Sequence, residues 1–256
     1  MTAKRMNFNE LLPWAVPAAF IVVWQLLSQF GFLSSRILPA PGDVVKAAIK
    51  LGSTGELLRY IGTSTQRAVI GFIIGGSAGF LLGLLNGLSA VSEKLFDSSL
   101  QMLRTIPHLA LIPLVILWFG IGEEAKVFLV AIGVLFPIYL NTCHGLKTID
   151  KGLIEAAKIY GLSGFALFRE IILPAALPSI LVGIRFSLGI MWVTLIVAET
   201  ISADSGIGYM AANAREFLQM DVVVLSILLY ALLGKLSDFI AKVIEKRCLK
   251  WHPSYQ

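Results

Sequence analysis

The composition of this 256-residue chain is that of an integral membrane protein: 57% of the residues are hydrophobic, 14% are charged and the mean hydropathy is +0.81. So much apolar surface leaves no room for a separate soluble domain. The net charge of +5 is modest and lies mostly near the ends of apolar runs, which argues against a nucleic-acid partner. Neither Cys143 nor Cys248 has a neighbour at metal-ligand spacing, so we expect no disulfide framework and no metal site.

Six apolar runs reach or approach the about 20 residues that cross a bilayer as a helix. They occupy residues 11–35, 68–92, 105–122, 127–146, 175–198 and 222–241. We therefore predict an all-α integral membrane protein with six transmembrane helices. Residues 11–245 would form one transmembrane domain between a cytoplasmic N-terminus, residues 1–10, and a cytoplasmic tail, residues 246–256.

Lys4 and Arg5 precede the first run. A secretory signal peptide is the alternative interpretation, but the run is long and no A-x-A cleavage site follows it, so we expect an anchored span. In the connection that follows, Pro39 and Pro41 predict a turn, and residues 43–50 a short surface helix.

A glycine recurs at every fourth position of the second run. These glycines are Gly71, Gly75, Gly79, Gly83 and Gly87. Such a stripe lets another helix approach closely, and we favour this packing role over a ligand role. The pattern does not tell whether the partner helix belongs to the same chain.

Polar residues and prolines gather at the start of the third run, where Arg104, Pro107, His108 and Pro113 follow one another closely. Proline loosens a membrane helix and frees carbonyl groups, which is tolerated beside a water-filled cavity or a neighbouring helix. His108 has no partner at helical spacing that would make a metal site, so we expect a packed or pathway-lining side chain.

Residues 147–175 form a charged, amphipathic segment between two apolar runs. Leu153, Ala156, Ala157 and Tyr160 share one face of a predicted short helix that Asp150 caps. Gly161 offers the positive φ of a helix exit.

Ser163 would cap a second short helix with Phe165, Phe168 and Ile172 on one side, and Pro174 would end it. An interfacial helix on lipid headgroups is the alternative for this segment.

Two ionisable residues, one inside the fifth run and one directly after it, are candidates for function, because charge inside a membrane is expensive. Arg185 either faces a pathway or snorkels to the interface. Glu199 heads a segment in which Gly206 and Gly208 predict a turn.

Six spans from a cytoplasmic N-terminus place residues 147–175 and the C-terminus in the cytoplasm. Most basic residues outside the spans then lie inside, as the positive-inside rule requires. The exceptions are Arg36, Lys46, Lys50, Arg59, Lys126 and Arg215.

Several motifs are missing: the chain has no G-x-x-x-x-G-K-[ST] phosphate loop, no H-E-x-x-H and no G-x-S-x-G. We therefore expect neither ATP hydrolysis nor another enzyme activity in this chain. Halves with matching broken helices, typical of many secondary carriers, are not found either.

The segment from Glu155 to Pro174 follows the spacing E-A-A-x(3)-G-x(9)-I-x-L-P. The matching positions are Glu155, Ala156, Ala157, Gly161, Ile171, Leu173 and Pro174. This pattern resembles the EAA loop by which the membrane subunits of bacterial ATP-binding-cassette (ABC) importers dock to their ATPase. A channel or secondary carrier, which needs no ATPase, is the less favoured alternative.

Further stretches, at residues 101–104, 107–114, 118–120, 136–139 and 198–199, resemble permeases of the nitrate, taurine and sulfonate import group. The resemblance covers about residues 12 to 250 and is greatest to the aliphatic sulfonate permeases. It implies the type I ABC importer fold in the bacterial inner membrane, with aliphatic sulfonates as substrate and taurine or nitrate as alternatives.

The partners implied by this resemblance are a second copy of the chain, a cytoplasmic ATPase dimer that binds ATP and Mg²⁺, and an extracytoplasmic binding protein. This chain itself would hold no cofactor. Candidates for the translocation path of an anion are Arg104, His108, Arg185 and Glu199.

Overall fold

The computed structural model describes residues 8–34 and 37–251, in which all regular secondary structure is helical and no strand is present. The first helices are α1 (Phe8–Gln29), α2 (Pro41–Ser53), α3 (Glu56–Leu88), α4 (Ala90–Thr105), the 3₁₀ turn η1 (His108–Leu111), α5 (Ile112–Phe119) and α6 (Glu123–Lys147). They are followed by α7 (Lys151–Ile159), α8 (Gly164–Leu167), the π-helical turn η2 (Phe168–Ile172), α9 (Leu173–Ser202), α10 (Ile207–Glu216) and α11 (Met220–Cys248).

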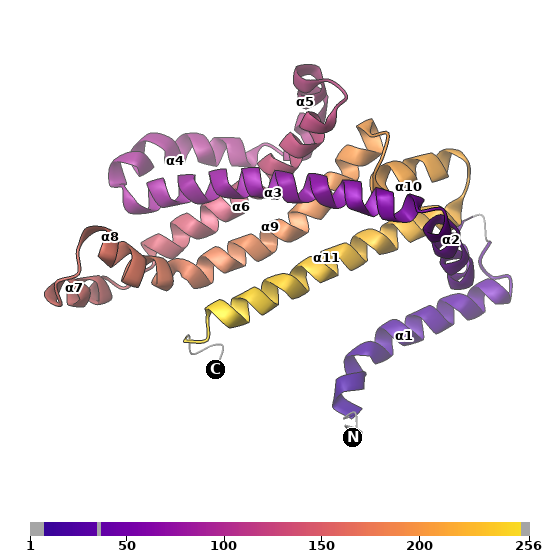
Figure 1. Cartoon of the computed structure of the whole chain (residues 1–256), viewed down its shortest axis with the longest axis horizontal. Helices are drawn as coiled ribbons and strands as arrows, with labels where there is room; N and C mark the ends of the chain where they lie inside the picture. Colours follow the sequence, from indigo (N-terminus) through magenta and orange to yellow (C-terminus); the bar gives the residue numbers. More distant parts are fainter. Residues whose placement is uncertain (1–7, 35–36, 252–256) are drawn as a thin grey trace.

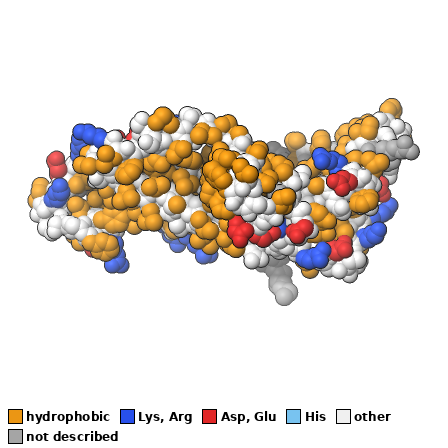
Figure 2. Space-filling view, turned by 90° about the horizontal axis from the view of Figure 1, so that it is seen from above, with side chains coloured by type: hydrophobic (Ala, Val, Ile, Leu, Met, Phe, Trp, Pro, Cys, Tyr) orange, Lys and Arg blue, Asp and Glu red, His pale blue; other side chains and the backbone are white. Residues whose placement is uncertain are grey.

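The long helices α3, α6, α9 and α11 form an elongated bundle (Figure 1). Helices α7 and α8 lie at one end, called here the α7 end, and α2 and α10 lie at the other, called the α10 end (Figure 1). Hydrophobic side chains cover a broad area of the face seen in Figure 2, and most charged side chains lie outside that area. This distribution is the one expected of a protein whose middle is surrounded by lipid.

By length and composition, four helical segments of the described residues can cross a membrane: α3, α6, the continuous helix Gly164–Ile201 and α11. A fifth is possible if α4 and the His108–Phe119 segment count as one bent span, and α1 contains a shorter apolar helix, Ala15–Gln29. The predicted count of six therefore stays a prediction.

The glycine stripe of α3 lies against α6 of the same chain. A Cβ atom added at Gly71 would come within 2.7 Å of the Val130 Cβ, and one at Gly75 would overlap the backbone of Ala131. Gly79, Gly83 and Gly87 face α6 in the same way. Because α3 presents no side chain along this stripe, α3 and α6 approach closely along most of their length.

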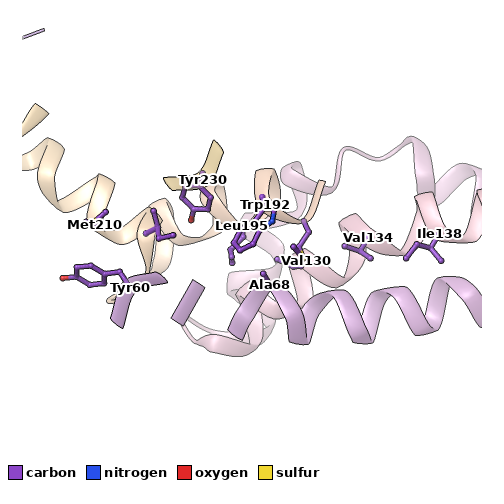
Figure 3. Packing of buried hydrophobic residues seen from close by; sticks show 11 residues of the cluster. Tyr60, Ala68, Val130, Val134, Ile138, Trp192, Leu195, Met210 and Tyr230 are labelled. Atoms are coloured by element: carbon purple, nitrogen blue, oxygen red, sulfur yellow. The ribbon is translucent and has the colours of Figure 1, made fainter. Parts of the chain in front are cut away.

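The main core lies where α3 and α6 meet α9, α10 and α11 (Figure 3). Ala68 of α3, Val130 of α6 and Leu195 of α9 are fully buried there. Tyr60 and Tyr230 extend this cluster to the α10 end. Buried residues near its start explain why α3 begins at Glu56, twelve residues before the apolar run starts.

Residues 105–122 do not form one straight helix. Helix α4 ends at Thr105, Ile106 is extended (φ −73°, ψ 120°), and the chain turns by 80° into the His108–Phe119 segment. Pro107 explains the break, since proline disfavours helical backbone in the residue before it. Pro113 does not break α5, because it occupies the first turn, where no N–H is needed.

The prediction that Pro174 ends a short helix was wrong. Helix α8, η2 and α9 run on as one helix from Gly164 to Ile201. At η2 the helix widens to a π-turn, in which the Leu173 N–H bonds to the Phe168 carbonyl. Pro174 directly follows this π-turn, so the change in hydrogen-bond register falls where its missing N–H would have interrupted the helix.

Candidate functional site

The segment at the α7 end exposes apolar side chains. The Asp150 carboxylate accepts a hydrogen bond from the Gly152 N–H (2.8 Å) and so caps α7 as predicted, whereas Ser163 makes no side-chain cap. Ala157 and Leu167 are buried, but Ile159 and Tyr160 are 85% and 88% exposed. An apolar tip on a charged segment is the kind of surface that a partner covers.

Gly161 follows this tip with φ +86°, in the left-handed region, and an added Cβ would meet nothing within 4 Å. The position therefore needs glycine for its backbone conformation and not for lack of space. The predicted coupling residues Glu155, Ala156 and Ala157 lie on α7, whereas Ile171, Leu173 and Pro174 lie at the junction of η2 and α9.

At the α10 end, the buried carboxylate of Glu199 on α9 gathers hydrogen bonds from three other helices. It accepts from the Arg67 Nη1 (2.7 Å), from the Ser64 hydroxyl (2.8 Å to Oε2), from the Tyr230 hydroxyl (2.9 Å) and from the Gly208 N–H (2.9 Å). Glu199 is 1% exposed and Arg67 2% exposed. A buried ion pair with every oxygen bonded holds the helices that supply its partners.

Arg67 also reaches two further groups. It donates to the Ser205 carbonyl (2.6 Å) and hydroxyl (3.0 Å), and to both carboxylate oxygens of Glu123 at the start of α6. Lys126 pairs with the same Glu123 at 3.1 Å. One guanidinium therefore connects α3, α6, α9 and the turn before α10; this group of residues is called here the Arg67 cluster.

A second charge cluster connects α9 and α11 nearer the α7 end. The Arg185 Nε donates to the Asp238 Oδ1 at 2.7 Å, and its Nη1 lies 3.8 Å from the Glu245 Oε2. Lys242 also pairs with Asp238, at 3.0 Å. The Arg185 and Asp238 side chains remain 40% and 30% exposed. This group of four is called here the Arg185 cluster.

His108 lies between two cavities. Its Nε2 is 2.9 Å from the Thr194 Oγ1 of α9, and Gly133 of α6 leaves the space for this contact. One cavity, of about 530 Å³, is also lined by Arg185 and Asp238. The other, of about 270 Å³, is also lined by Arg104.

Three of the four predicted pathway residues thus line these two neighbouring cavities: Arg104, His108 and Arg185. Glu199 does not join them, because its carboxylate is buried in the Arg67 cluster. Sequence analysis missed Arg67 and Thr194. Arg67 stands immediately before a charge-free run, and this boundary position was the available signal. The described residues contain no group of three His, Cys, Asp or Glu side chains that could hold a metal ion.

Residues 68–250 match the family model "Binding-protein-dependent transport system inner membrane component". The chain belongs to this family. It is accordingly a multi-pass permease subunit and not an enzyme, because its relatives are transport permeases whose ATPase is a separate subunit.

Two similar proteins both bear the name "Putative aliphatic sulfonates transport permease protein". The protein of Escherichia coli K12 is 63% identical over 96% of this chain and 94% of its own length. The protein of Bacillus subtilis 168 is 43% identical over 98% of this chain and 91% of its own length. The taurine transport system permease protein of E. coli is more distant, at 32% identity over 93% of this chain and 89% of its own.

Among solved structures, the crystal structure of an amino acid ABC transporter with histidines has a TM-score of 0.64. The match covers 78% of this chain and 97% of that chain at 18% identity, so it shows a shared fold.

Proposed function

We propose that this chain is the membrane-spanning subunit of an ATP-driven importer of aliphatic sulfonates. The observation that carries the proposal is the 63% identity, over nearly the whole chain, to the E. coli protein named for aliphatic sulfonates. Two copies of the chain would form the path, a cytoplasmic ATPase dimer would bind ATP and Mg²⁺, and an extracytoplasmic binding protein would deliver the substrate.

In this proposal the chain crosses the inner membrane six times, with α1 and the bent α4–α5 segment supplying the first and third spans. The α7 end faces the cytoplasm, together with both termini, and the α10 end faces outward. The opposite placement of α7–α8 and of α2–α10 supports this topology (Figure 1). The single transmembrane domain would cover residues 11–245, between residues 1–10 and 246–256.

The segment of residues 147–175 couples transport to ATP in this proposal. The exposed side chains of Ile159 and Tyr160 would enter a groove on the ATPase. Closure of the ATPase pair would then move α7 and α8, and the unbroken helix Gly164–Ile201 would carry this motion into the membrane. The path would open alternately to the two sides.

For the path itself, we propose that Arg104, His108 and Arg185 provide a weakly positive lining for an anion, which must enter easily and also leave. For Glu199, whose carboxylate is buried among four partners, we propose instead that it holds the α10 end together.

The test is growth of cells that lack this chain on an alkanesulfonate or taurine as the only sulfur source, and on nitrate as the only nitrogen source. We expect that these cells fail to grow only on the alkanesulfonate, and that the intact chain restores this growth. Loss of growth on taurine or nitrate instead would overturn the substrate assignment. Uptake by reconstituted vesicles without ATP would overturn the importer mechanism.

A further inference from the structure

The 530 Å³ cavity beside His108 combines a long apolar wall with one charged end. Val182, Phe186 and Val193 form the wall along one face of α9, and all three are more than half exposed in the described chain. The other end of the wall is the His108–Thr194 pair. Thr194 stands nine positions after Arg185, which corresponds to about 14 Å along the helix axis.

The charge at one end of this wall is accessible and already paired. Arg185 offers five N–H donors in one plane; Asp238 accepts from one of them, and the Glu245 Oε2 lies 3.8 Å from another nitrogen. Its side chain is 40% exposed, and Asp238, its partner at 2.7 Å, is 30% exposed. An ion pair this exposed contributes little free energy, so another anion can replace the carboxylate at small cost.

We propose that this cavity binds an amphiphilic monoanion, with the sulfonate headgroup on Arg185 and the alkyl chain along Phe186 and Val193. The proposal rests on the function proposed above and deepens it. Asp238 is then a competing anion: the substrate displaces it from Arg185, and its return expels the substrate. The competition keeps binding weak enough for release, as transport requires.

The wall also discriminates among anions. A longer alkyl chain buries more methylene groups, and each buried methylene raises affinity by about fourfold. Nitrate has no alkyl chain to bury. Taurine would place an ammonium group against the apolar wall, where a charge is poorly solvated.

Occupancy can be measured without the binding protein, whose own selectivity would otherwise dominate. A Val193→Cys variant of the permease–ATPase complex in nanodiscs is treated with a water-soluble maleimide, and labelling is read by mass spectrometry. The native Cys248, which is exposed and lies outside the cavity, is the internal control. Methanesulfonate, butanesulfonate, octanesulfonate, taurine and nitrate are the competing anions.

We expect the alkanesulfonates to protect Cys at position 193 at concentrations that fall with chain length, with no protection of Cys248. Adding Arg185→Gln should abolish the protection, whereas Lys246→Gln, which removes a similar charge from the exposed face of α11, should not. Adding Asp238→Asn should lower the protecting concentration by about tenfold, the size of one hydrogen bond to a charged group.

Three results would overturn the site. These are no labelling at position 193 in the ligand-free complex, protection that does not depend on chain length, and protection unchanged by Arg185→Gln. ATP-dependent uptake by the wild-type complex with its binding protein tests the proposed function separately. Uptake without protection would leave the function standing and remove the site. Protection without uptake of any sulfonate would leave the site standing and remove the proposed function.

Discussion

Helix α9 is tied to its neighbours by two ion pairs, one near its C-terminal end and one near its middle, and the two pairs differ in burial. The Arg67 and Glu199 side chains are 3% and 0% exposed, and those of Arg185 and Asp238 are 40% and 30% exposed. Hydroxyl, backbone and carboxylate groups around Arg67 and Glu199 form further hydrogen bonds with both charged side chains. A buried, fully bonded pair cannot lose one member cheaply, whereas an exposed pair can exchange its partner. The Arg67 cluster is therefore suited to hold the helices together, and the Arg185 cluster to exchange one anion for another.

Loss of the buried guanidinium should have the largest effect. Arg67→Leu leaves the Glu199 carboxylate buried without its cation, and we expect a loss of about 3–5 kcal/mol in stability. The measurement is the midpoint of thermal unfolding of the detergent-purified complex. Arg59→Leu, on the exposed face of the same helix, is the matched control and should unfold near the wild-type temperature. Equal midpoints for the two variants would contradict the holding role.

The α3–α6 contact offers a second way to test what holds the bundle. A Cβ at Gly75 would overlap the Ala131 backbone, so Gly75→Ala should cost about 1–3 kcal/mol through forced separation of the helices. On the same helix, Gly62 has no atom within 4 Å of an added Cβ. Gly62→Ala should therefore be neutral or stabilise by up to about 1 kcal/mol. If both variants behave alike in thermal unfolding, close packing is not what these glycines provide.

At the α7 end, a change in backbone preference should affect coupling. Gly161→Val places a β-branched residue at φ +86°, which costs about 1–2 kcal/mol locally. We expect less ATPase to copurify with this variant, although the membrane-embedded part stays folded. Gly161→Asn is the control, since asparagine tolerates the left-handed region better. Normal copurification with the valine variant would show that this turn does not matter for docking.

The smallest change in stability should come from the exposed pair. Arg185→Gln should lower stability by only about 0–1 kcal/mol, because both side chains of the pair are partly exposed. Sulfonate uptake should nevertheless fall. If Arg185→Gln unfolded at a temperature as low as that of Arg67→Leu, the two clusters would not differ in their contribution to stability.

Local pattern was enough for much of the candidate site. The spacing from Glu155 to Pro174, the Asp150 cap and the positive φ of Gly161 were readable because each depends on residues close in sequence. The positions of Arg104, His108 and Arg185 were also readable, as polar residues inside or beside apolar runs. Their convergence on neighbouring cavities was not, because it depends on how α4, α9 and α11 are assembled.

Pro107 and Pro174 also differ in a way that local sequence does not predict. Pro107 breaks its helix and Pro174 does not, although both stand in apolar sequence. At Pro174 a π-turn keeps the backbone hydrogen-bonded from α8 into α9, whereas at Pro107 the chain bends away by 80°. Whether the groups freed by a proline find new partners depends on the neighbouring backbone geometry, which is not encoded in the proline itself.

By itself, the sequence determined the membrane class, the apolar runs, the close-packing stripe of α3 and the family pattern of the α7 segment. These features follow from hydrophobicity and short-range spacing. Only the tertiary structure decided that the stripe meets α6, that Arg67 pairs with a glutamate 132 residues away, and that Arg185 pairs with Asp238. The reason is physical: a charge inside a membrane requires a partner, but helix assembly alone determines which opposite charge lies within reach.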